Sequence, residues 1–361
     1  MKIAFFLDGP ILPISTGAAE RFVNILRSQN SDGDNTFLFK CYREWSDDIA
    51  LYKNESFVSY FFQPFDYFNN TQLKLNLLAH NSIDFCYFAN PETLLTIGLE
   101  FKKKGYTIIY DCHDIYSEID KRLGLNQEKQ DISNFTQLIA STYADIVYTC
   151  SEVDKQHLIN LGVPFEKILV LPNSVDVSKL EYKLHNIKNK NILFVGHNFY
   201  EPNMNCIKII KKEIYPSPLL TDYTFNICGL TPEREVKELE DDRFTFLGFV
   251  ENLETIYSES TIAVAPIFEG SGTRVKILQY LASGIPTITT TIGCEGLDLI
   301  DGKEIVICDE VEKYPHLIKQ ITSELETYEK LSKNGRIAIE KKYDWTKNCK
   351  NATEYLKTFK V

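Results

Sequence analysis

The sequence lacks the features that would place it among membrane, zinc-binding or disulfide-rich proteins. Its nine cysteines are scattered singly, with no Cys-x2-Cys pair, so neither a zinc site nor a paired disulfide framework is indicated. An odd number of unpaired thiols is typical of the reducing cytosol. No apolar run approaches the roughly 18 residues of a membrane-spanning helix, and the first run ends at Asp8, too early for a signal peptide. We therefore expect a cytoplasmic protein that is not integral to a membrane.

An excess of positive charge is also lacking. The formal net charge of the 361 residues is -11 at pH 7, which argues against a nucleic-acid-binding protein, and any site for a polyanion would have to be local. Hydrophobic residues make up 44% and charged residues 25%, proportions typical of a globular protein. The length exceeds that of one compact core and indicates two domains.

Short apolar runs alternate with helix-length segments, a pattern that predicts parallel sheets covered by helices on both faces. The first series of predicted strands comprises residues 2–7, 37–42, 57–62, 84–88, 107–110, 145–150 and 168–171. A polar, aperiodic stretch follows at residues 182–190, and the pattern then starts again. The second series comprises residues 192–196, 225–228, 244–247, 262–265, 287–290 and 305–307.

We therefore predict an α/β protein with two open parallel sheets, in domains 1–185 and 186–342. Ligands of such sheets bind at the carboxyl ends of the strands, so the default site is a cleft between the domains. Residues 343–361 have apolar side chains at near-helical spacing and are predicted to form a docked terminal helix. From Lys330 onward there are nine basic and three acidic residues; a solvated helix face and contact with a membrane surface are both open.

The stretch of residues 266–284 gives the strongest indication of a ligand site. A glycine-rich turn follows a predicted strand and leads into a helix, and Arg274 and Lys276 fall in or beside its first turn. Cations there oppose the helix dipole unless a bound anion offsets them. We interpret the turn as a phosphate site, with two side chains that merely point into solvent as the alternative. The spacing fits neither a P-loop nor Gly-x-Gly-x-x-Gly, so nucleotide hydrolysis and nicotinamide redox chemistry lose support.

These motifs resemble those of the family 4 retaining glycosyltransferases, whose two Rossmann-like domains form the glycosyltransferase B (GT-B) fold. The resemblance extends over nearly the whole chain. It is carried by Glu269-Gly270-Ser271-Gly272-Thr273-Arg274-Val275-Lys276, typical of a Gly-x-Gly-Thr-Arg-x-Lys subgroup, and by Glu295-Gly296-Leu297, Gly248-Phe249-Val250 and Pro172-Asn173-Ser174-Val175-Asp176.

The resemblance also implies which residues form the site. The catalytic residues are His113, Arg274 and Lys276, of which the two cations bind the diphosphate. The donor-binding residues are Gly196, His197, Asn198, Glu269, Gly270, Ser271, Gly272, Thr273, Gln279 and Glu295. On the acceptor side, Thr16-Gly17-Ala18-Ala19-Glu20-Arg21 resembles the family's Gly-Gly-x-Glu turn and implies Gly17, Ala18 and Glu20. Residues 343–361 resemble the helix that crosses back to the first domain.

Three departures from the family pattern affect this assignment. Gln279 stands ten positions after Glu269, where the subgroup has a glutamate, and Ala18 replaces a glycine. An amide oxygen can still accept a hydrogen bond from a ribose hydroxyl, but without the strength that a carboxylate's charge adds. The basic pair usual after the Gly196 loop is missing, which leaves Arg274 and Lys276 to bind the phosphates.

The function implied is transfer of a sugar, with retention of configuration, from a nucleoside-diphosphate sugar to a hydroxyl of a glycan, lipid-linked or protein acceptor. The role expected from it is glycan, surface-polysaccharide or glycoprotein assembly. We expect no cofactor, no metal ion and no nucleic-acid partner, and a cytoplasmic location with peripheral contact at the inner membrane face left open. Two alternatives remain: a non-catalytic partner or chaperone of another transferase, and a nucleotide-sugar epimerase on the same fold.

Overall fold

The computed structural model describes the chain except for residues 10, 13, 15, 30–35, 42–48, 185, 271, 360 and 361. The described residues divide into two compact units. Unit 1 comprises Met1–Asn173 and Trp345–Val361, and unit 2 comprises Ser174–Asp344. The division precedes the polar stretch at residues 182–190 because the chain already packs on unit 2 there: Arg336 donates to the carbonyl of Leu180 at 2.6 Å, and Val175 lies in the core of unit 2.

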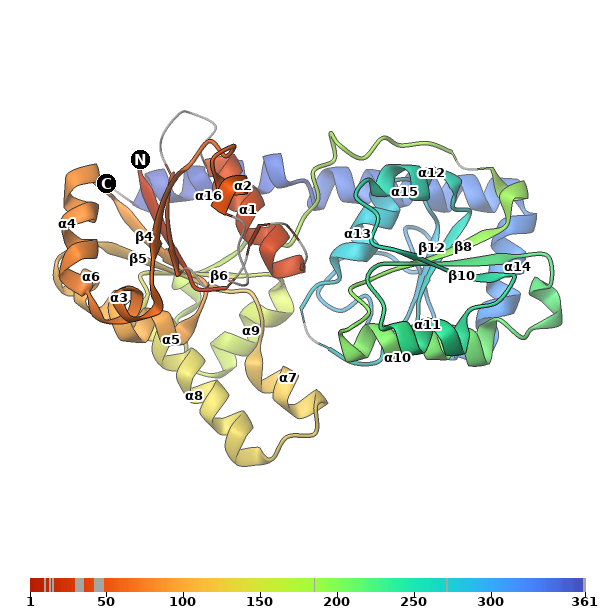
Figure 1. The fold of residues 1–361 in the computed structure, drawn as a ribbon, viewed down its shortest axis with the longest axis horizontal. Helices are drawn as coiled ribbons and strands as arrows, with labels where there is room; N and C mark the ends of the chain where they lie inside the picture. The colour runs from red at the N-terminus through yellow and green to blue at the C-terminus, as the bar shows by residue number, and fades with distance from the viewer. Residues whose placement is uncertain are drawn as a thin grey trace. The chain divides into compact units, whose positions relative to one another are not determined.

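Unit 1 is a parallel sheet with the strand order β3-β2-β1-β4-β5-β6-β7 (Figure 1). Its strands are β1 (Ile3–Leu7), β2 (Thr36–Cys41), β3 (Val58–Phe62), β4 (Phe85–Phe88), β5 (Thr107–Cys112), β6 (Ile146–Thr149) and β7 (Ile168–Val170). Strand β1 pairs with both β2 and β4, so the strand order reverses there. In doubly wound sheets, the carboxyl ends of the strands beside such a reversal form the ligand crevice.

Helices cover both faces of this sheet because its strands are apolar on both sides. The described helices of unit 1 are α1 (Gly17–Gln29), α2 (Ile49–Tyr52), α3 (Pro64–Asn69), α4 (Thr71–Asn81), α5 (Pro91–Thr93), the π-helix η1 (Leu94–Gly98), α6 (Leu99–Lys103), α7 (Tyr116–Arg122), α8 (Gln127–Tyr143), α9 (Glu152–Asn160), the 3-10 turn η2 (Phe165–Lys167) and α16 (Trp345–Phe359). Buried residues of α1 and α16 share one core cluster, and those of α4, α6, α8 and α9 share the other.

Unit 2 repeats this arrangement with the strand order β10-β9-β8-β11-β12-β13. The strands are β8 (Asn191–Val195), β9 (Thr224–Cys228), β10 (Phe244–Gly248), β11 (Ile262–Ala265), β12 (Thr287–Thr289) and β13 (Val306–Ile307). All pairings in this sheet are parallel, and the order reverses at β8, which pairs with β9 and β11. The two Rossmann-like sheets expected from the sequence are confirmed.

The described helices of unit 2 also lie on both faces of its sheet (Figure 1). They are η3 (Ile187–Asn189), α10 (Glu201–Ile209), η4 (Ile210–Ile214), η5 (Pro218–Leu220), α11 (Glu233–Leu239), α12 (Leu253–Glu259), α13 (Val275–Ala282), η6 (Val311–Lys313), α14 (Tyr314–Ser323) and α15 (Leu325–Lys342). Buried residues of α10 and α14 belong to one core cluster, whereas those of α13 lie in others.

Helix α16 returns to unit 1, as the expected crossover helix does. Trp345 and Leu356 are buried in the same cluster as residues of α1, and Thr353 Oγ1 lies 3.1 Å from Gln29 Oε1 on α1. Burying each such apolar side chain contributes roughly 1.5–3 kcal/mol. The apolar face of α16 is thus covered by unit 1. Among the described helices, none combines the length and apolarity needed to cross a bilayer.

Candidate functional site

The loop after β8 lies at the order reversal of the unit 2 sheet. Asn198 is buried, and its amide nitrogen donates to Thr231 Oγ1 at 2.8 Å. Its Oδ1 is buried too and has no hydrogen-bond partner among the described residues. The predicted Gly196 packs against its neighbours, since its backbone nitrogen bonds the carbonyl of Cys228 at 3.0 Å. The exposed His197 contributes its carbonyl, which accepts from Asn203 Nδ2.

Sequence reasoning did not single out Gly229, which follows β9 and faces this loop. Its φ is +119°, and a Cβ there would lie 1.7 Å from the carbonyl oxygen of Gly196. Only glycine allows both the left-handed conformation and the close approach of the two backbones. The signal in the sequence was a glycine directly after a buried strand, a position typical of close backbone approach in such sheets.

The glycine-rich turn after β11 is held by the side chain that follows it. Gly270 and Gly272 have φ values of +92° and +73°, a conformation that glycine adopts without strain. Arg274 is the N-cap residue of α13, and its guanidinium donates to the carbonyls of Gly270, at 2.9 Å, and Gly272. The arginine therefore braces the turn instead of pointing into solvent. Ser271 lies outside the described residues.

Lys276 crosses from α13 to α10, the helices that follow β11 and β8. Its Nζ donates to Asn203 Oδ1 at 2.7 Å and lies 4.2 Å from the centre of the Phe194 ring. Burial lowers the pKa of Lys276 to about 8; nearby Arg274 also lowers it, while Cys206 opposes the shift. The charged side chains of Arg274 and Lys276 thus lie together at the start of α13, where the strand order of the unit 2 sheet reverses. A bound anion there would stabilise both positive charges.

The remaining donor-side residues make separate contacts. Thr273 is buried, and its Oγ1 has no hydrogen-bond partner among the described residues. Glu269 is exposed and accepts from Asn205 Nδ2 at 3.1 Å. Gln279 lies farther along α13, where its Oε1 accepts from the Tyr257 hydroxyl at 3.1 Å. Half-buried Glu295 lies in the turn after β12.

On the acceptor side, the predicted residues lie at the start of α1 and after β5 of unit 1. Gly17, Ala18 and Glu20 form the first turn of α1, which Thr16 caps by accepting from the backbone nitrogen of Ala19 at 3.1 Å. The side chain of His113 is 14% exposed. Its Nδ1 lies 3.3 Å from the Asp111 carbonyl, and its Nε2 lies 3.7 Å from Asp114 Oδ2.

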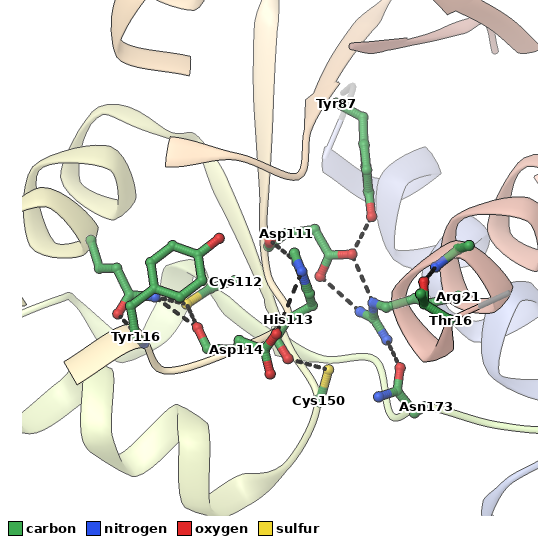
Figure 2. A network of polar contacts seen from close by, with 12 residues as sticks. Thr16, Arg21, Tyr87, Asp111, Cys112, His113, Asp114, Tyr116, Cys150 and Asn173 are labelled. Carbon is green, nitrogen blue, oxygen red and sulfur yellow. Dashed lines mark hydrogen bonds and ion pairs between the residues drawn. The ribbon is translucent and has the colours of Figure 1, made fainter. Parts of the chain in front are cut away.

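Sequence reasoning missed a buried ion pair beside His113. Arg21 of α1 donates from Nε and Nη2 to the two carboxylate oxygens of Asp111 at the end of β5 (Figure 2). Arg21 stands among apolar residues of α1, and Asp111 follows an apolar run. A cation on a buried helix face and a carboxylate at a strand end could have predicted the pair, since buried charges are almost always paired.

A hollow of about 420 Å³ lies on unit 1, and seven of its eight lining residues follow His113 in the sequence. It is lined by Glu92, Tyr116, Asn126, Glu128, Lys129, Ile132, Ser133 and Thr136. Burial, with the carboxylates of Asp114 and Glu92, raises the pKa of Tyr116 well above its ordinary value, so its hydroxyl keeps its proton at neutral pH. Most groups here can hydrogen-bond to hydroxyls.

No group of three or more His, Cys, Asp or Glu side chains is placed to hold a metal ion within the described ranges. The sequence has one pair of aspartates spaced as Asp-x-Asp, Asp32 and Asp34, and both lie outside those ranges.

Comparison with known families assigns both halves of the chain. The model for Glycosyltransferase Family 4 matches residues 16–179, and the model for Glycosyl transferases group 1 matches residues 189–324. The chain therefore carries a Glycosyltransferase Family 4 domain followed by a Glycosyl transferases group 1 domain. Together the two models include the start of α1, His113 and the glycine-rich turn.

Solved structures confirm the GT-B fold over nearly the whole chain. Anabaena HepE in complex with UDP and glucose has a TM-score of 0.78 and 16% sequence identity, and the match covers 99% of this chain and 100% of that one. Sucrose-phosphate synthase from Thermosynechococcus elongatus has a TM-score of 0.79 and 13% identity, with 99% of each chain covered.

Two curated relatives come from Klebsiella pneumoniae. An uncharacterized 44.6 kDa protein in the cps region is 25% identical over 187 residues, which are 48% of this chain and 48% of that protein. An uncharacterized 41.2 kDa protein in the cps region is 25% identical over 206 residues, 53% of this chain and 54% of that protein. The chain therefore spans about half the length of the curated relatives it matches.

Proposed function

We propose that this protein transfers a sugar from a uridine-diphosphate sugar to a hydroxyl group of a glycan acceptor, with retention of configuration and without a metal ion. The observation that carries the proposal is the placement of Arg274 and Lys276 at the start of α13, beside the β8/β11 reversal. Matches to two glycosyltransferase families and the UDP complex of the similar HepE support the choice of donor.

The charge that develops in the reaction lies on the leaving diphosphate. As the bond between the anomeric carbon and the diphosphate breaks, negative charge grows on the phosphate oxygens, and fixed cations beside them lower the barrier. Arg274 and Lys276 supply such charge, and the start of α13 adds the positive end of a helix dipole. Because the turn is already braced by Arg274, little reorganisation accompanies binding.

Unit 1 supplies the acceptor side in this proposal. His113 Nε2 lies toward the Asp114 carboxylate, and with Nδ1 donating to the Asp111 carbonyl it can accept a hydrogen bond from a sugar hydroxyl. The hollow beside Tyr116 suits a saccharide, because its carboxylate, amide and hydroxyl side chains bind hydroxyl groups, whereas a diphosphate would meet Glu92 and Glu128. The relatives in a cps region support a role in surface-polysaccharide assembly.

A binding assay followed by a turnover assay tests the donor assignment. The melting temperature is measured with UDP, GDP, ADP and their common sugar conjugates, for wild type and Arg274→Ala, with and without EDTA. Since a ligand that binds only the folded state stabilises it, we expect a UDP-selective, EDTA-insensitive shift that the variant loses. UDP release from the matching sugar conjugate then establishes turnover, and NMR of the product gives the anomeric configuration. A shift that EDTA abolishes contradicts metal independence.

One observation favours a second candidate, a non-catalytic partner of another transferase. Gln279 replaces the subgroup's glutamate, and its amide oxygen already accepts from Tyr257. Such a partner binds the UDP-sugar without releasing UDP, whereas the enzyme releases UDP with any competent acceptor, including water.

A further inference from the structure

Arg21 and Asp111 form a two-pronged ion pair in the interior of unit 1. Arg21 Nε lies 2.8 Å from Asp111 Oδ2, and Arg21 Nη2 lies 2.8 Å from Asp111 Oδ1. The side chains are 1% and 0% exposed. Burial alone would lower the pKa of Arg21, but the Asp111 carboxylate outweighs it and holds that pKa well above its ordinary value. The guanidinium is therefore charged throughout the physiological range.

The same guanidinium also reaches the end of unit 1, where the chain passes on to Ser174. Arg21 Nη1 donates to the carbonyl of Leu171 at 2.8 Å and to Asn173 Oδ1 at 3.0 Å. Figure 2 shows Arg21 between Asp111 on one side and Asn173 on the other, with the Tyr87 hydroxyl pointing at the same carboxylate. Three segments far apart in the sequence, α1, the end of β5 and residues 171–173, thus meet at one side chain.

Stability alone does not account for a charged pair at this position. Removing two charges from water is costly, and well-packed apolar side chains often serve a fold as well or better. A guanidinium fixes the positions of its acceptors, because each of its N–H groups must point at its own acceptor. Apolar side chains have no such directional requirement. The pair therefore fixes the positions of the three segments relative to one another.

Two of these segments carry the acceptor-side residues. Arg21 directly follows Glu20 in the first turns of α1, and Asp111 stands two residues before His113. The His113 ring packs edge-on against Phe22, the next residue of α1, at 5.1 Å between ring centres. Its Nδ1 can bond the Asp111 carbonyl only as a donor, because a carbonyl only accepts. That contact leaves Nε2 directed toward Asp114 and available to a substrate.

We propose that Arg21 is a positioning residue that holds His113 and the first turn of α1 in the geometry that acceptor transfer requires. The proposal rests on the proposed function, because it assigns Arg21 a role in that reaction. Arg21 acts through Asp111, Phe22 and the α1 backbone, and it does not itself contact substrate.

The test compares two variants that avoid an unpaired buried charge. Arg21→Lys keeps a cation opposite Asp111 but loses the bidentate hydrogen bonds of the guanidinium. The double variant Arg21→Met/Asp111→Leu removes both charges. UDP release from the UDP-sugar identified by thermal shift is measured with water as acceptor, giving kcat and KM. We expect kcat to fall about 10- to 100-fold in folded Arg21→Lys, as for a small displacement of a reacting group, with donor KM within twofold of wild type. The double variant should lose kcat similarly.

A matched control separates positioning from stability. Lys74 is also a buried cation of unit 1, and its ammonium donates to the carbonyls of Asp66 and Asn70, at 2.8 and 2.9 Å, away from the residues assigned to the site. Folded Lys74→Met should keep the wild-type kcat, whatever its effect on the melting temperature. If folded Arg21→Lys also keeps the wild-type kcat, Arg21 is only structural and the proposal is wrong.

A spectroscopic readout keeps the proposal separate from the function on which it rests. The ring signals of His113 in 1H–15N spectra, assigned with His113→Gln, should shift in Arg21→Lys and remain at wild-type positions in Lys74→Met. If wild type shows no UDP release but the His113 signals shift as expected, the proposed function fails while the structural coupling stands. Unshifted His113 signals in folded Arg21→Lys overturn the positioning role whatever the activity.

Discussion

The ammonium group of Lys276 lies 2.7 Å from Asn203 Oδ1 and joins the start of α13 to α10. These two helices follow β11 and β8, the strands on either side of the order reversal in the unit 2 sheet. Burial keeps the amine near its titration point, with a pKa of about 8. A lysine in this state gains most from a bound anion, because the anion both restores its proton and offsets its desolvation.

The pKa of Lys276 predicts how UDP affinity depends on pH. The diphosphate binds the protonated amine, so the dissociation constant should be constant below about pH 8 and rise up to about tenfold per pH unit above it. Calorimetric titration with UDP from pH 7 to 9.5, in buffers of different ionisation enthalpy, measures both the affinity and the proton uptake. Lys276→Met should abolish the slope, whereas Lys208→Met, which removes the ion pair between Lys208 on α10 and Glu235 on α11, should keep it. Equal affinity across that range contradicts the assignment.

Lys276 should also lower the free energy of unfolding at neutral pH. Its pKa falls from 10.5 in the unfolded chain to about 8 in the folded one, so between these values the unfolded chain binds the additional proton. The contribution of this group to the free energy of unfolding therefore rises with pH from 8 to 10.5 and is least favourable below 8. We expect Lys276→Met to melt at or above the wild-type temperature at pH 7, and UDP should stabilise it less than it stabilises the wild type. A lower melting temperature for this variant would show that the Asn203 bond outweighs the desolvation.

Arg274→Ala should lower the rate of UDP release by about 10²-fold or more, in line with the loss of other preorganised charges. The variant removes a cation and also the bonds that brace the carbonyls of Gly270 and Gly272. Arg243, just before β10, offers a matched control on the same unit, since its guanidinium donates to the carbonyls of Leu220 and Tyr223, which precede β9. Arg243→Ala should reduce the melting temperature and leave kcat/KM near wild type. Equal losses of kcat/KM in both variants would refute a specific role for Arg274.

Gly229→Ala should impair UDP binding through the backbone. The new Cβ would lie 1.7 Å from the Gly196 carbonyl oxygen at a φ of +119°, so the loop after β8 must move, with a loss of roughly 1–3 kcal/mol in the free energy of unfolding. Gly302→Ala is the matched control, because Gly302 has a φ of +69° and open space around its Cβ position. It should lower stability by less and leave the UDP affinity unchanged. Both quantities follow from urea unfolding and calorimetry.

Gln279→Glu tests whether residue 279 contacts the ribose of the donor. The new carboxylate can still accept from the Tyr257 hydroxyl and can also form a charge-assisted bond to a ribose hydroxyl, which is about twice as strong as a neutral one. We expect several-fold tighter binding of UDP and faster UDP release if the residue contacts the donor. Deoxyuridine diphosphate should show no such gain. An unchanged affinity for both ligands would place Gln279 outside the donor site.

Alternating apolar runs and helical segments were sufficient to predict both sheets, because fully buried parallel strands need apolar side chains on both faces. The glycine-rich turn before α13 was likewise predictable, since glycine punctuation and two cations at a helix start are local signals. Tertiary structure decided how those side chains are used. Lys276 reaches Asn203, 73 residues away in sequence, and no local pattern specifies that contact.

The sequence by itself thus determined the two-domain α/β architecture and the positions where glycines and charges stand along the chain. Only the tertiary structure decided that Arg21 finds Asp111, 90 residues later, and Leu171, 150 residues later. The physical reason is that propensity and periodicity act over a few neighbouring residues, whereas the partner of a buried charge is selected by the folding of the whole sheet and by the cost of leaving that charge unpaired.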